Sequence, residues 1–285
     1  MFRERILSCG KLSLNLASGP ANGPALIGLH GVNRRWQCLL PLTTALPPRW
    51  QMHCLDQRGH GTSDRADRYL VTDYAADVAA LIRTEFTEPV ILYGHSLGAM
   101  VAAHVAAAEP ARVRAVVAED PPFHTMGERI DSTPLLSYFH ALENLCGRAL
   151  PRADLLAQLG EAPLRNPLTG HNVPLRETRD AAAIRFAAAA LRQLDPAVLR
   201  PIVAGQWLDG YDVEGVGRSL QCPVLLLQAD HAVGGMLIDD DAALWRQVVA
   251  DLTVVRFHGA GHMLHWQRTH EVANVVTAFL ESLVL

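Results

Sequence analysis

The chain lacks the features that mark nucleic-acid-binding and membrane proteins. Its 25 Lys and Arg against 29 Asp and Glu give a net charge of −4, and no basic patch suited to nucleic acid is visible. No apolar run reaches the length of about 18 residues that a membrane span needs; the nearest, residues 181–191, is short and contains Arg185. The first residues lack the apolar core of a signal peptide. We therefore expect neither a nucleic-acid nor a membrane partner.

Cysteine is also scarce and follows no pattern. The five cysteines are odd in number and widely scattered, and they include no C-x-x-C pair. This usage fits a reducing compartment, in which thiols serve as small hydrophobic side chains. We therefore predict a cytoplasmic protein without a disulfide framework.

The sequence does contain short apolar runs that alternate with helical patterns. Runs that are apolar on both faces favour central strands of a parallel sheet. Between and after them, residues 73–86, with Thr72 as the expected N-cap, and residues 272–283 show helical spacing of apolar positions. This alternation predicts an α/β fold with its chemistry at the carboxyl ends of the strands. The apolar runs are residues 24–29, 50–55, 89–93, 113–118, 223–228 and 252–257.

Residues 121–219 break this alternation. The segment shows helical pieces separated by Pro, Gly and Asn, and no convincing strand. It is too long to be a loop between two core strands. We therefore predict a helical insertion folded over the strand ends, with residues 1–120 and 220–285 forming the core.

A serine between two glycines follows one of the apolar runs. Residues 90–100 read VILYGHSLGAM, and an alanine-rich helix is expected over residues 97–108. Glycine and serine also make ordinary turns. A sharp strand-to-helix turn, however, exposes a serine as a nucleophile, and small flanking residues let the helix pass close to the strand. The context favours Ser96 as a nucleophile.

This arrangement resembles the nucleophile elbow, G-x-S-x-G, of the α/β-hydrolase superfamily. The resemblance spans about residues 10–120 and 220–285. It implies an α/β-hydrolase fold, with a mostly parallel central sheet flanked by helices and a helical cap inserted between core strands. His30-Gly31-Val32 resembles the superfamily's oxyanion loop, which implies that the backbone N–H groups of Val32 and Leu97 stabilise the developing negative charge. Residues 56–64, DQRGHGTSD, resemble a segment whose usual role is a structural polar turn.

The resemblance places the general base at His262, in the segment FHGAGHMLHWQR before the last helix. His258, His265 and His270 lie nearby, and such a cluster suggests a metal. The spacing matches neither H-E-x-x-H nor a Cys/His zinc pattern. We therefore predict no metal.

Two aspartates are candidates for the acid that orients the histidine. Most relatives place it after the penultimate strand, where Asp230 lies, but the expected position holds Ala232. Some relatives place it after the strand that follows the elbow helix, where Asp120 stands in AVVAEDPPF. We favour Asp120 and keep Asp230 as the alternative, with Glu119 expected to face away. Asp120 could also only cap the entrance to the insertion.

A serine with a histidine base and an oxyanion hole attacks a carbonyl group and forms an acyl-enzyme. We therefore predict a serine hydrolase that acts on a small-molecule carboxylic ester, lactone or thioester. The alternatives are a C–C bond hydrolase, an acyltransferase or perhydrolase with the same triad, and a catalytically degenerate ligand-binding relative. No dinucleotide fingerprint or P-loop is present, so no cofactor is predicted. The oligomeric state is left open.

The cap is expected to supply much of the substrate pocket. Its predicted apolar walls, which could equally be ordinary packing, are Trp36, Phe123, Tyr138, Phe139 and Met263. Arg34 and Arg35 directly follow the oxyanion loop and could meet an acidic substrate. The alternative is that both are ordinary solvent-exposed arginines on the surface.

Overall fold

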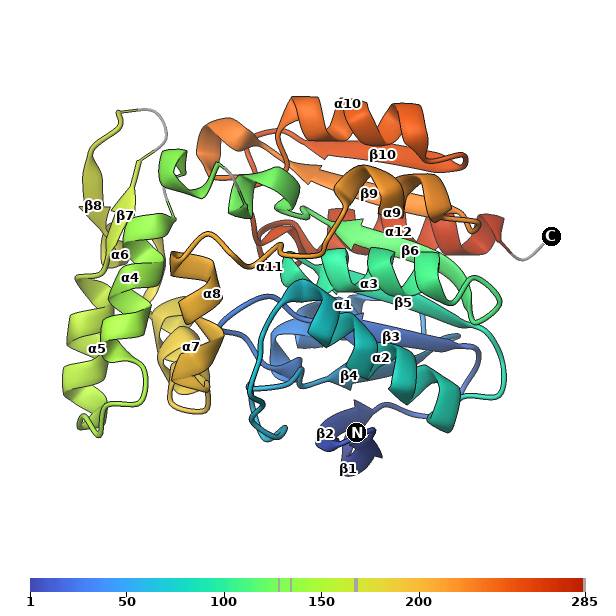
Figure 1. The fold of residues 1–285 in the computed structure, drawn as a ribbon, viewed down its shortest axis with the longest axis horizontal. Helices are drawn as coiled ribbons and strands as arrows, with labels where there is room; N and C mark the ends of the chain where they lie inside the picture. Colours follow the sequence, from blue (N-terminus) through green and yellow to red (C-terminus); the bar gives the residue numbers. More distant parts are fainter. Residues whose placement is uncertain (128, 134, 167–168, 284–285) are drawn as a thin grey trace.

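The computed structural model describes residues 1–283, apart from residues 128, 134, 167 and 168. Within these residues, a large twisted sheet carries helices on both faces, and further helices lie beyond one end of its strands (Figure 1). The strand order is β1-β2-β4-β3-β5-β6-β9-β10. These strands are Arg3–Cys9 (β1), Leu12–Ser18 (β2), Ala25–Leu29 (β3), Gln51–Leu55 (β4), Val90–His95 (β5), Val113–Glu119 (β6), Val224–Ala229 (β9) and Leu252–Phe257 (β10).

The sheet is parallel from β4 to β10 and antiparallel at the β1–β2 edge. Each of the six predicted apolar runs is a strand of the parallel part, so the mostly parallel α/β fold is confirmed. The β1–β2 hairpin was not predicted. Most of β1, which reads RERILSC, is exposed, and charged residues on an edge strand hide the apolar pattern on which the prediction relied.

Helices pack on both faces of this sheet and form two apolar cores. In β5, Val90 and Leu92 point into one core while Ile91 and Tyr93 point into the other, as alternation along a strand requires. The first core is covered by α2 (Val71–Glu85), α3 (Leu97–Ala108), α9 (Val213–Ser219) and α10 (Asp239–Val248). The second is covered by α1 (Leu40–Ala45), α11 (Leu264–Gln267) and α12 (Thr269–Ser282).

The start of α2 differs from the prediction. The N-cap is Leu70, and Thr72 lies inside the first turn. The carboxylate of Asp73 accepts the Leu70 N–H at 2.9 Å and so satisfies an amide at the helix start. Thr72 as N-cap is therefore wrong.

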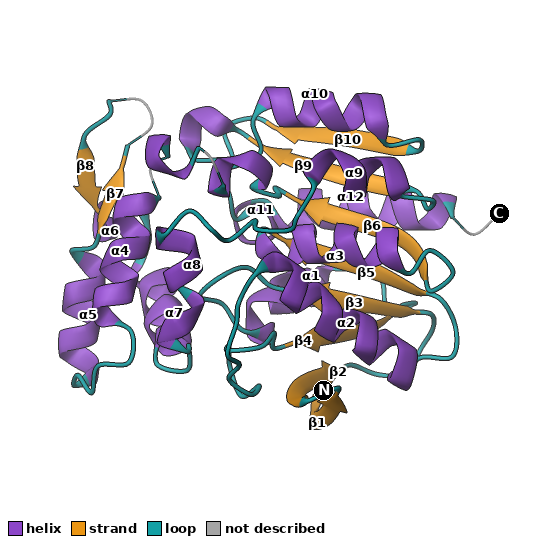
Figure 2. Ribbon diagram, in the orientation of Figure 1, coloured by secondary structure: helices purple, strands orange, loops and turns teal. Residues whose placement is uncertain are grey.

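Shorter helices form a layer beyond the carboxyl ends of the parallel strands, at the left of Figure 2. The layer comprises α4 (Leu136–Leu145), α5 (Arg152–Gly160), α6 (Leu175–Thr178), α7 (Ala181–Leu191), α8 (Arg200–Val203) and a small hairpin of β7 (Pro163–Arg165) and β8 (Asn172–Pro174). The hairpin corrects the expectation that this segment holds no strand, since three-residue strands are too short to leave an apolar pattern. Helix α9 packs against α3 and α10 instead, although it lies within the predicted insertion.

The composition led to two predictions, one about the cysteines and one about membrane-spanning segments. All five cysteines are buried and unpaired, as expected for thiols used in packing. Across the described ranges, no helix combines the length and the apolarity that crossing a membrane would require.

Candidate active site

Ser96 lies in the sharp turn between β5 and α3. Its backbone angles, φ 56° and ψ −117°, are strained for a residue with a side chain. A Cβ atom at Gly94 would lie 2.1 Å from the carbonyl oxygen of Gly98, and one at Gly98 would lie 2.1 Å from that of Leu29. Glycine at both positions therefore lets α3 start this close to β5 and β3.

The loop after β3 runs beside this turn. A Cβ atom at Gly31 would lie 3.1 Å from the Cβ of Ser96. Val32 follows Gly31, and Leu97 is the first residue of α3, where amides have no acceptor within the helix. In the part of the chain that the structure describes, neither Val32 nor Leu97 donates its N–H to another residue. Both predicted oxyanion donors are thus available next to Ser96.

Asp120 and His262 meet at the carboxyl end of the sheet. The Nδ1 atom of His262 lies 2.6 Å from Oδ2 of Asp120. The ring of His262 packs 4.6 Å, centroid to centroid, from the ring of His95, the residue before Ser96. The structure therefore brings together the predicted base and acid, and it packs His262 against the residue that precedes Ser96, the predicted nucleophile. Because Nδ1 of His262 is hydrogen-bonded to Asp120, Nε2 is the ring nitrogen left for another partner.

The carboxylate of Asp120 is held by backbone amides as well as by His262. Oδ2 accepts the N–H of Met236 at 2.8 Å, while Oδ1 accepts those of Leu237 at 3.1 Å and Ala229 at 3.2 Å. The residue is fully buried and has a positive φ of 45°. Four hydrogen-bonding partners on one buried carboxylate fix its position.

Asp230, the alternative acid, is used elsewhere. It caps the short turn that follows β9, where Oδ1 accepts the N–H of Ala232 at 3.0 Å and Oδ2 that of Gly259 at 2.8 Å. These two backbone hydrogen bonds hold the pKa of Asp230 below its ordinary value. Asp230 therefore serves the backbone of two loops, whereas Asp120 contacts His262.

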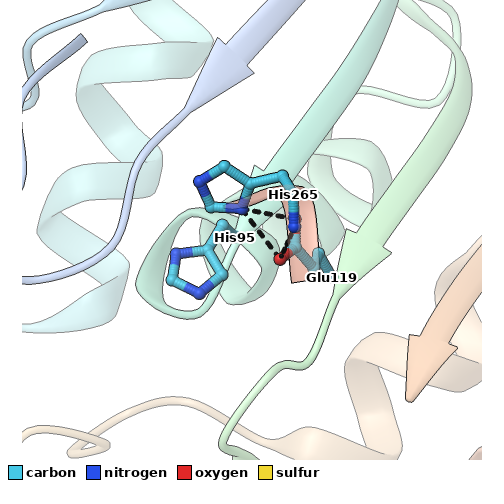
Figure 3. A group of neighbouring side chains, drawn as sticks. All are labelled: His95, Glu119 and His265. Carbon is cyan, nitrogen blue, oxygen red and sulfur yellow. Dashed lines mark hydrogen bonds and ion pairs between the residues drawn. The ribbon is translucent and has the colours of Figure 1, made fainter. Parts of the chain in front are cut away.

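A second acid–histidine pair lies directly beside the first. Nδ1 of His265 lies 2.8 Å from Oε1 of Glu119, and the backbone N–H of His265 donates to the same oxygen at 3.1 Å. The hydroxyl of Tyr93 donates to the other carboxylate oxygen. Figure 3 shows the hydrogen bonds between His265 and Glu119 with the ring of His95 beside them. Glu119 thus faces away from His262, and its carboxylate is fully hydrogen-bonded.

His95 completes this buried group. Its Nε2 donates to the carbonyl oxygen of His262 at 2.9 Å, and burial, followed by the charges of His262 and His265, holds the pKa of His95 well below its ordinary value. His95, Glu119 and His265 are the residues here that could hold a metal, since one ligand atom of each lies within 4.8 Å of the others. The hydrogen bonds that they make to protein atoms give each of them a structural role without an ion.

Sequence reasoning missed this buried network. The sequence has two consecutive acids, Glu119 and Asp120, and two histidines three residues apart, His262 and His265, but no local pattern pairs an acid with a histidine. The other two histidines of the predicted cluster, His258 and His270, are exposed.

The predicted pocket walls are scattered in the structure. Phe123 is fully buried against Trp245, with ring centroids 4.5 Å apart. Trp36 packs on Phe2 at 5.4 Å. Tyr138 and Phe139 lie together in α4, with ring centroids 5.9 Å apart, and Met263 contacts Arg34.

An open pocket of about 770 Å³ lies among α4, α5 and α7. Its walls include Leu145, Leu156 and Ile184, but none of the predicted wall residues. The pocket assignment of the five aromatic and methionine side chains therefore stays a prediction.

The segment 56–64 forms the polar turn expected of it. The carboxylate of Asp56 accepts the N–H of Trp36 at 2.7 Å and a side-chain N–H of Asn15 at 2.9 Å. Arg58 forms a bidentate ion pair with Asp77. These contacts tie the segment to Trp36, to β2 and to α2, which is a structural task.

Comparisons with known proteins agree with this fold. The family model described as alpha/beta hydrolase fold matches residues 24–269. The chain therefore belongs to the α/β-hydrolase superfamily, as its resemblance to that superfamily implied. A 2-(acetamidomethylene)succinate hydrolase from Mesorhizobium japonicum is 30% identical over 289 residues, which cover 99% of this chain and 96% of that protein.

Two further similarities point the same way. A pimeloyl-[acyl-carrier protein] methyl ester esterase from Xanthomonas oryzae pv. oryzae is 31% identical over 206 residues, covering 65% of this chain and 77% of the esterase. A crystal structure of E-2-(acetamidomethylene)succinate hydrolase superposes with a TM-score of 0.71 at 27% identity and covers 99% of this chain and 100% of that one. These relatives support hydrolase activity.

Proposed function

We propose that this protein is a serine hydrolase in which Ser96 is the nucleophile, His262 the general base and Asp120 the acid. The observation that carries the proposal is the 2.6 Å hydrogen bond between Nδ1 of His262 and Asp120. It fixes the tautomer in which Nε2 is free to take a proton, and it stabilises the imidazolium that forms. The strained backbone of Ser96, which directly follows His95, supports its role as nucleophile, since the ring of His95 packs against that of His262.

The reaction follows from these positions. Oγ of Ser96 attacks the carbonyl carbon of the substrate while Nε2 of His262 accepts the hydroxyl proton. The N–H groups of Val32 and Leu97 donate to the oxyanion, an interaction that strengthens as the negative charge develops. The leaving group takes the proton from His262, and water then attacks the acyl-enzyme by the same route in reverse.

Carboxylic esters are the first substrates proposed, with lactones and thioesters reacting in the same way. The methyl ester esterase among the relatives supports esters. The relative with 30% identity is named for a substrate with an acetamido group, which supports a second candidate: hydrolysis of an acylated amine through the same acyl-enzyme. C–C bond hydrolysis and acyl transfer need the same triad. A degenerate ligand-binding role is less well supported, because the chain keeps a serine in the strained turn and a histidine hydrogen-bonded to an aspartate.

The proposal also covers the substrate pocket, the cellular compartment and the kind of substrate. The helices of residues 121–219 act as the cap and bound the substrate pocket together with the oxyanion loop. The unpaired, buried thiols support action in a reducing compartment such as the cytoplasm. The substrate is a small molecule with an acyl group.

A labelling and turnover experiment tests the proposal. The wild-type protein should react with a fluorophosphonate probe and hydrolyse p-nitrophenyl acetate and butyrate. The Ser96→Ala variant should do neither, while its thermal unfolding stays close to that of the wild type. A folded wild-type protein that neither labels nor turns over these esters would refute the serine hydrolase assignment and leave the ligand-binding alternative.

A further inference from the structure

His95 lies where the three segments that carry the proposed catalytic groups meet. It is the last residue of β5 and directly precedes Ser96, the proposed nucleophile. Its Nε2 lies 2.9 Å from the carbonyl oxygen of His262, the proposed base. A Cβ atom at Gly31, in the oxyanion loop, would lie 3.0 Å from Nδ1 of His95 and 3.1 Å from the Cβ of Ser96. The nucleophile turn, the base loop and the oxyanion loop therefore pack around this one side chain.

The hydrogen-bond partner of His95 determines which ring nitrogen carries the proton. A carbonyl oxygen only accepts hydrogen bonds, so Nε2 is the protonated nitrogen that donates to His262. Burial, and after it the charges of His262 and His265, hold the pKa of His95 well below its ordinary value, so the ring is uncharged at neutral pH. Nδ1 then bears no proton, and it has no hydrogen-bond partner among the described residues. His95 is thus a neutral donor and not a second base.

Two contacts fix His262, one through its side chain and one through its backbone. Asp120 lies 2.6 Å from Nδ1 of the ring and sets the orientation of the imidazole. The hydrogen bond from His95 holds the main chain, and the two imidazole rings pack with their centroids 4.6 Å apart. Asp120 follows β6, whereas His95 ends β5. Of these two contacts, the one from His95 joins His262 to the strand that leads into Ser96.

Close packing leaves the His95 ring little freedom to move. The residue is 2% exposed, and the ring of His265 packs edge-on against it with centroids 4.9 Å apart (Figure 3). A side chain enclosed in this way cannot rotate without moving its neighbours. We therefore assign His95 no contact with substrate, so any effect that it has on the reaction passes through His262.

We propose that His95 is a positioning residue for the reaction: its hydrogen bond to the backbone of His262 holds Nε2 of His262 within reach of the Ser96 hydroxyl. Proton transfer needs the two heavy atoms about 2.6–3.2 Å apart, and a displacement of about 1 Å can lower the rate about 100-fold. An uncharged His95 suits this role, because a cation there would oppose the imidazolium that His262 becomes. The inference rests on the proposed serine hydrolase function and deepens it.

Two substitutions separate the hydrogen bond of His95 from the bulk of its side chain. His95→Gln places an amide nitrogen the same number of bonds from Cα as Nε2, so it keeps a donor for His262. His95→Met is of similar length and removes the donor. His104→Met is the matched control, because His104 is a half-buried histidine of α3 whose ring packs 5.7 Å from that of Tyr211. Burial lowers the pKa of His104 as well.

The time course of fluorophosphonate labelling gives two quantities, the rate constant at saturating probe and the probe concentration that gives half of it. The final amount of labelled protein counts the folded molecules, so partial unfolding changes this end point. We expect the rate constant to fall about 10- to 100-fold in His95→Met and to stay within about threefold of the wild type in His95→Gln and His104→Met. The half-saturating concentration should change less than about twofold in all three, because His95 does not contact the probe.

A second measurement does not depend on how His95→Met folds. Long-range nitrogen–proton NMR of protein with isotope-labelled histidine shows which ring nitrogen carries the proton, and the His95 signal is the one missing from His95→Gln. We expect a neutral ring with its proton on Nε2 between about pH 6 and pH 8. A proton on Nδ1, or on both nitrogens, overturns the proposal.

The outcomes keep this inference apart from the proposed function. A wild-type protein that the probe does not label counts against the serine hydrolase function and removes the basis of this inference as well. If the wild type is labelled and His95→Met reacts with the same rate constant, the positioning role alone is overturned. Equal losses in His95→Met and His95→Gln overturn it too, because the donor would then not be what matters.

Discussion

Two acid–histidine pairs stand side by side at the end of β6, and they differ in access rather than in chemistry. Asp120 contacts His262 and Glu119 contacts His265, each through Nδ1 of the ring, at 2.6 Å and 2.8 Å. The His262 side chain is 18% exposed, whereas that of His265 is fully buried. The two acids are consecutive residues: Glu119 is the last residue of β6, and Asp120 follows it with a positive φ of 45°.

In the proposed function, this difference in exposure decides which of the two pairs can be catalytic. A histidine oriented by an acid is a base only if its other nitrogen can reach a reacting atom. His262 is accessible and lies beside the nucleophile elbow, whereas Nε2 of His265 is buried without a partner. The pair of Glu119 and His265, here called the inner pair, instead ties the loop of residues 262–265 to β6 through the side chain and the backbone N–H of His265. It is thus placed to hold the outer pair, Asp120 and His262, in position.

The largest effect should come from removing the outer acid. In Asp120→Asn the amide cannot accept all four hydrogen bonds of the carboxylate, so the tautomer that presents Nε2 of His262 to Ser96 is no longer fixed. We expect kcat for p-nitrophenyl acetate to fall about 10³- to 10⁴-fold, as when the acid of a serine triad is lost. Steady-state kinetics measure this fall in kcat, and circular dichroism checks that the variant is folded.

Asp230→Asn is the matched control, since it makes the same change at the other candidate acid. Its activity should stay within about twofold of the wild type, because Asp230 bonds only to loop amides, and losing one such cap costs about 1 kcal/mol of stability. If Asp230→Asn loses the activity and Asp120→Asn keeps it, the assignment of the acid is wrong.

Breaking the inner pair should affect stability more than chemistry. Glu119→Gln removes the charge that faces His265 and Tyr93 in a fully buried site. We expect the free energy of unfolding to fall by about 3–5 kcal/mol, the usual cost of breaking a buried pair. The kcat of the folded fraction should fall less than about tenfold, because Ser96, His262 and Asp120 are untouched. Urea unfolding gives the free energy of unfolding. Active-site titration with the fluorophosphonate probe gives the concentration of folded enzyme, by which the rate is divided to obtain kcat.

A double-mutant cycle with His265→Gln sharpens this result. If the two side chains act as a pair, the double variant should be no less stable than the worse single variant. Additive losses would mean that the pair is not coupled. A loss of kcat in Glu119→Gln as large as that in Asp120→Asn would mean that the inner pair takes part in the chemistry.

The sequence predicted the outer pair and not the inner one for a physical reason. The elbow, the parallel strands and the position of His262 depend on local patterns: glycines around Ser96, apolar runs and a histidine before the last helix. The choice between Asp120 and Asp230 depends on which side chain reaches His262 across the sheet, and resemblance alone could only rank them. The pairing of Glu119 with His265 joins residues 146 positions apart, and no local signal reports such a contact. The insertion of residues 121–219 was predicted only from its length, because its short helices and three-residue strands carry weak patterns.

A smaller effect should come from histidines that are buried like His265 but lack a hydrogen-bonded acid. Burial lowers the pKa of His30 to about 4 and that of His60 to about 3. Both values lie below the unfolded value of about 6.5, so the unfolded chain takes up protons first as the pH falls. The stability that these two neutral histidines contribute is therefore fully present above pH 6.5 and is lost progressively below it. The free energy of unfolding falls by about 2 kcal/mol per histidine at pH 5.

Urea unfolding at pH 7.5 and pH 5.0 measures this loss, and His60→Gln isolates one of the two groups. Glutamine does not titrate, so the fall in unfolding free energy between these pH values should be about 2 kcal/mol smaller in the variant than in the wild type. An equal fall in both proteins would show that His60 carries a proton in the folded state. Burial would then not be enough to distinguish a neutral histidine from one that is paired with an acid, and the contrast between the inner and outer pairs would have to rest on their hydrogen bonds alone.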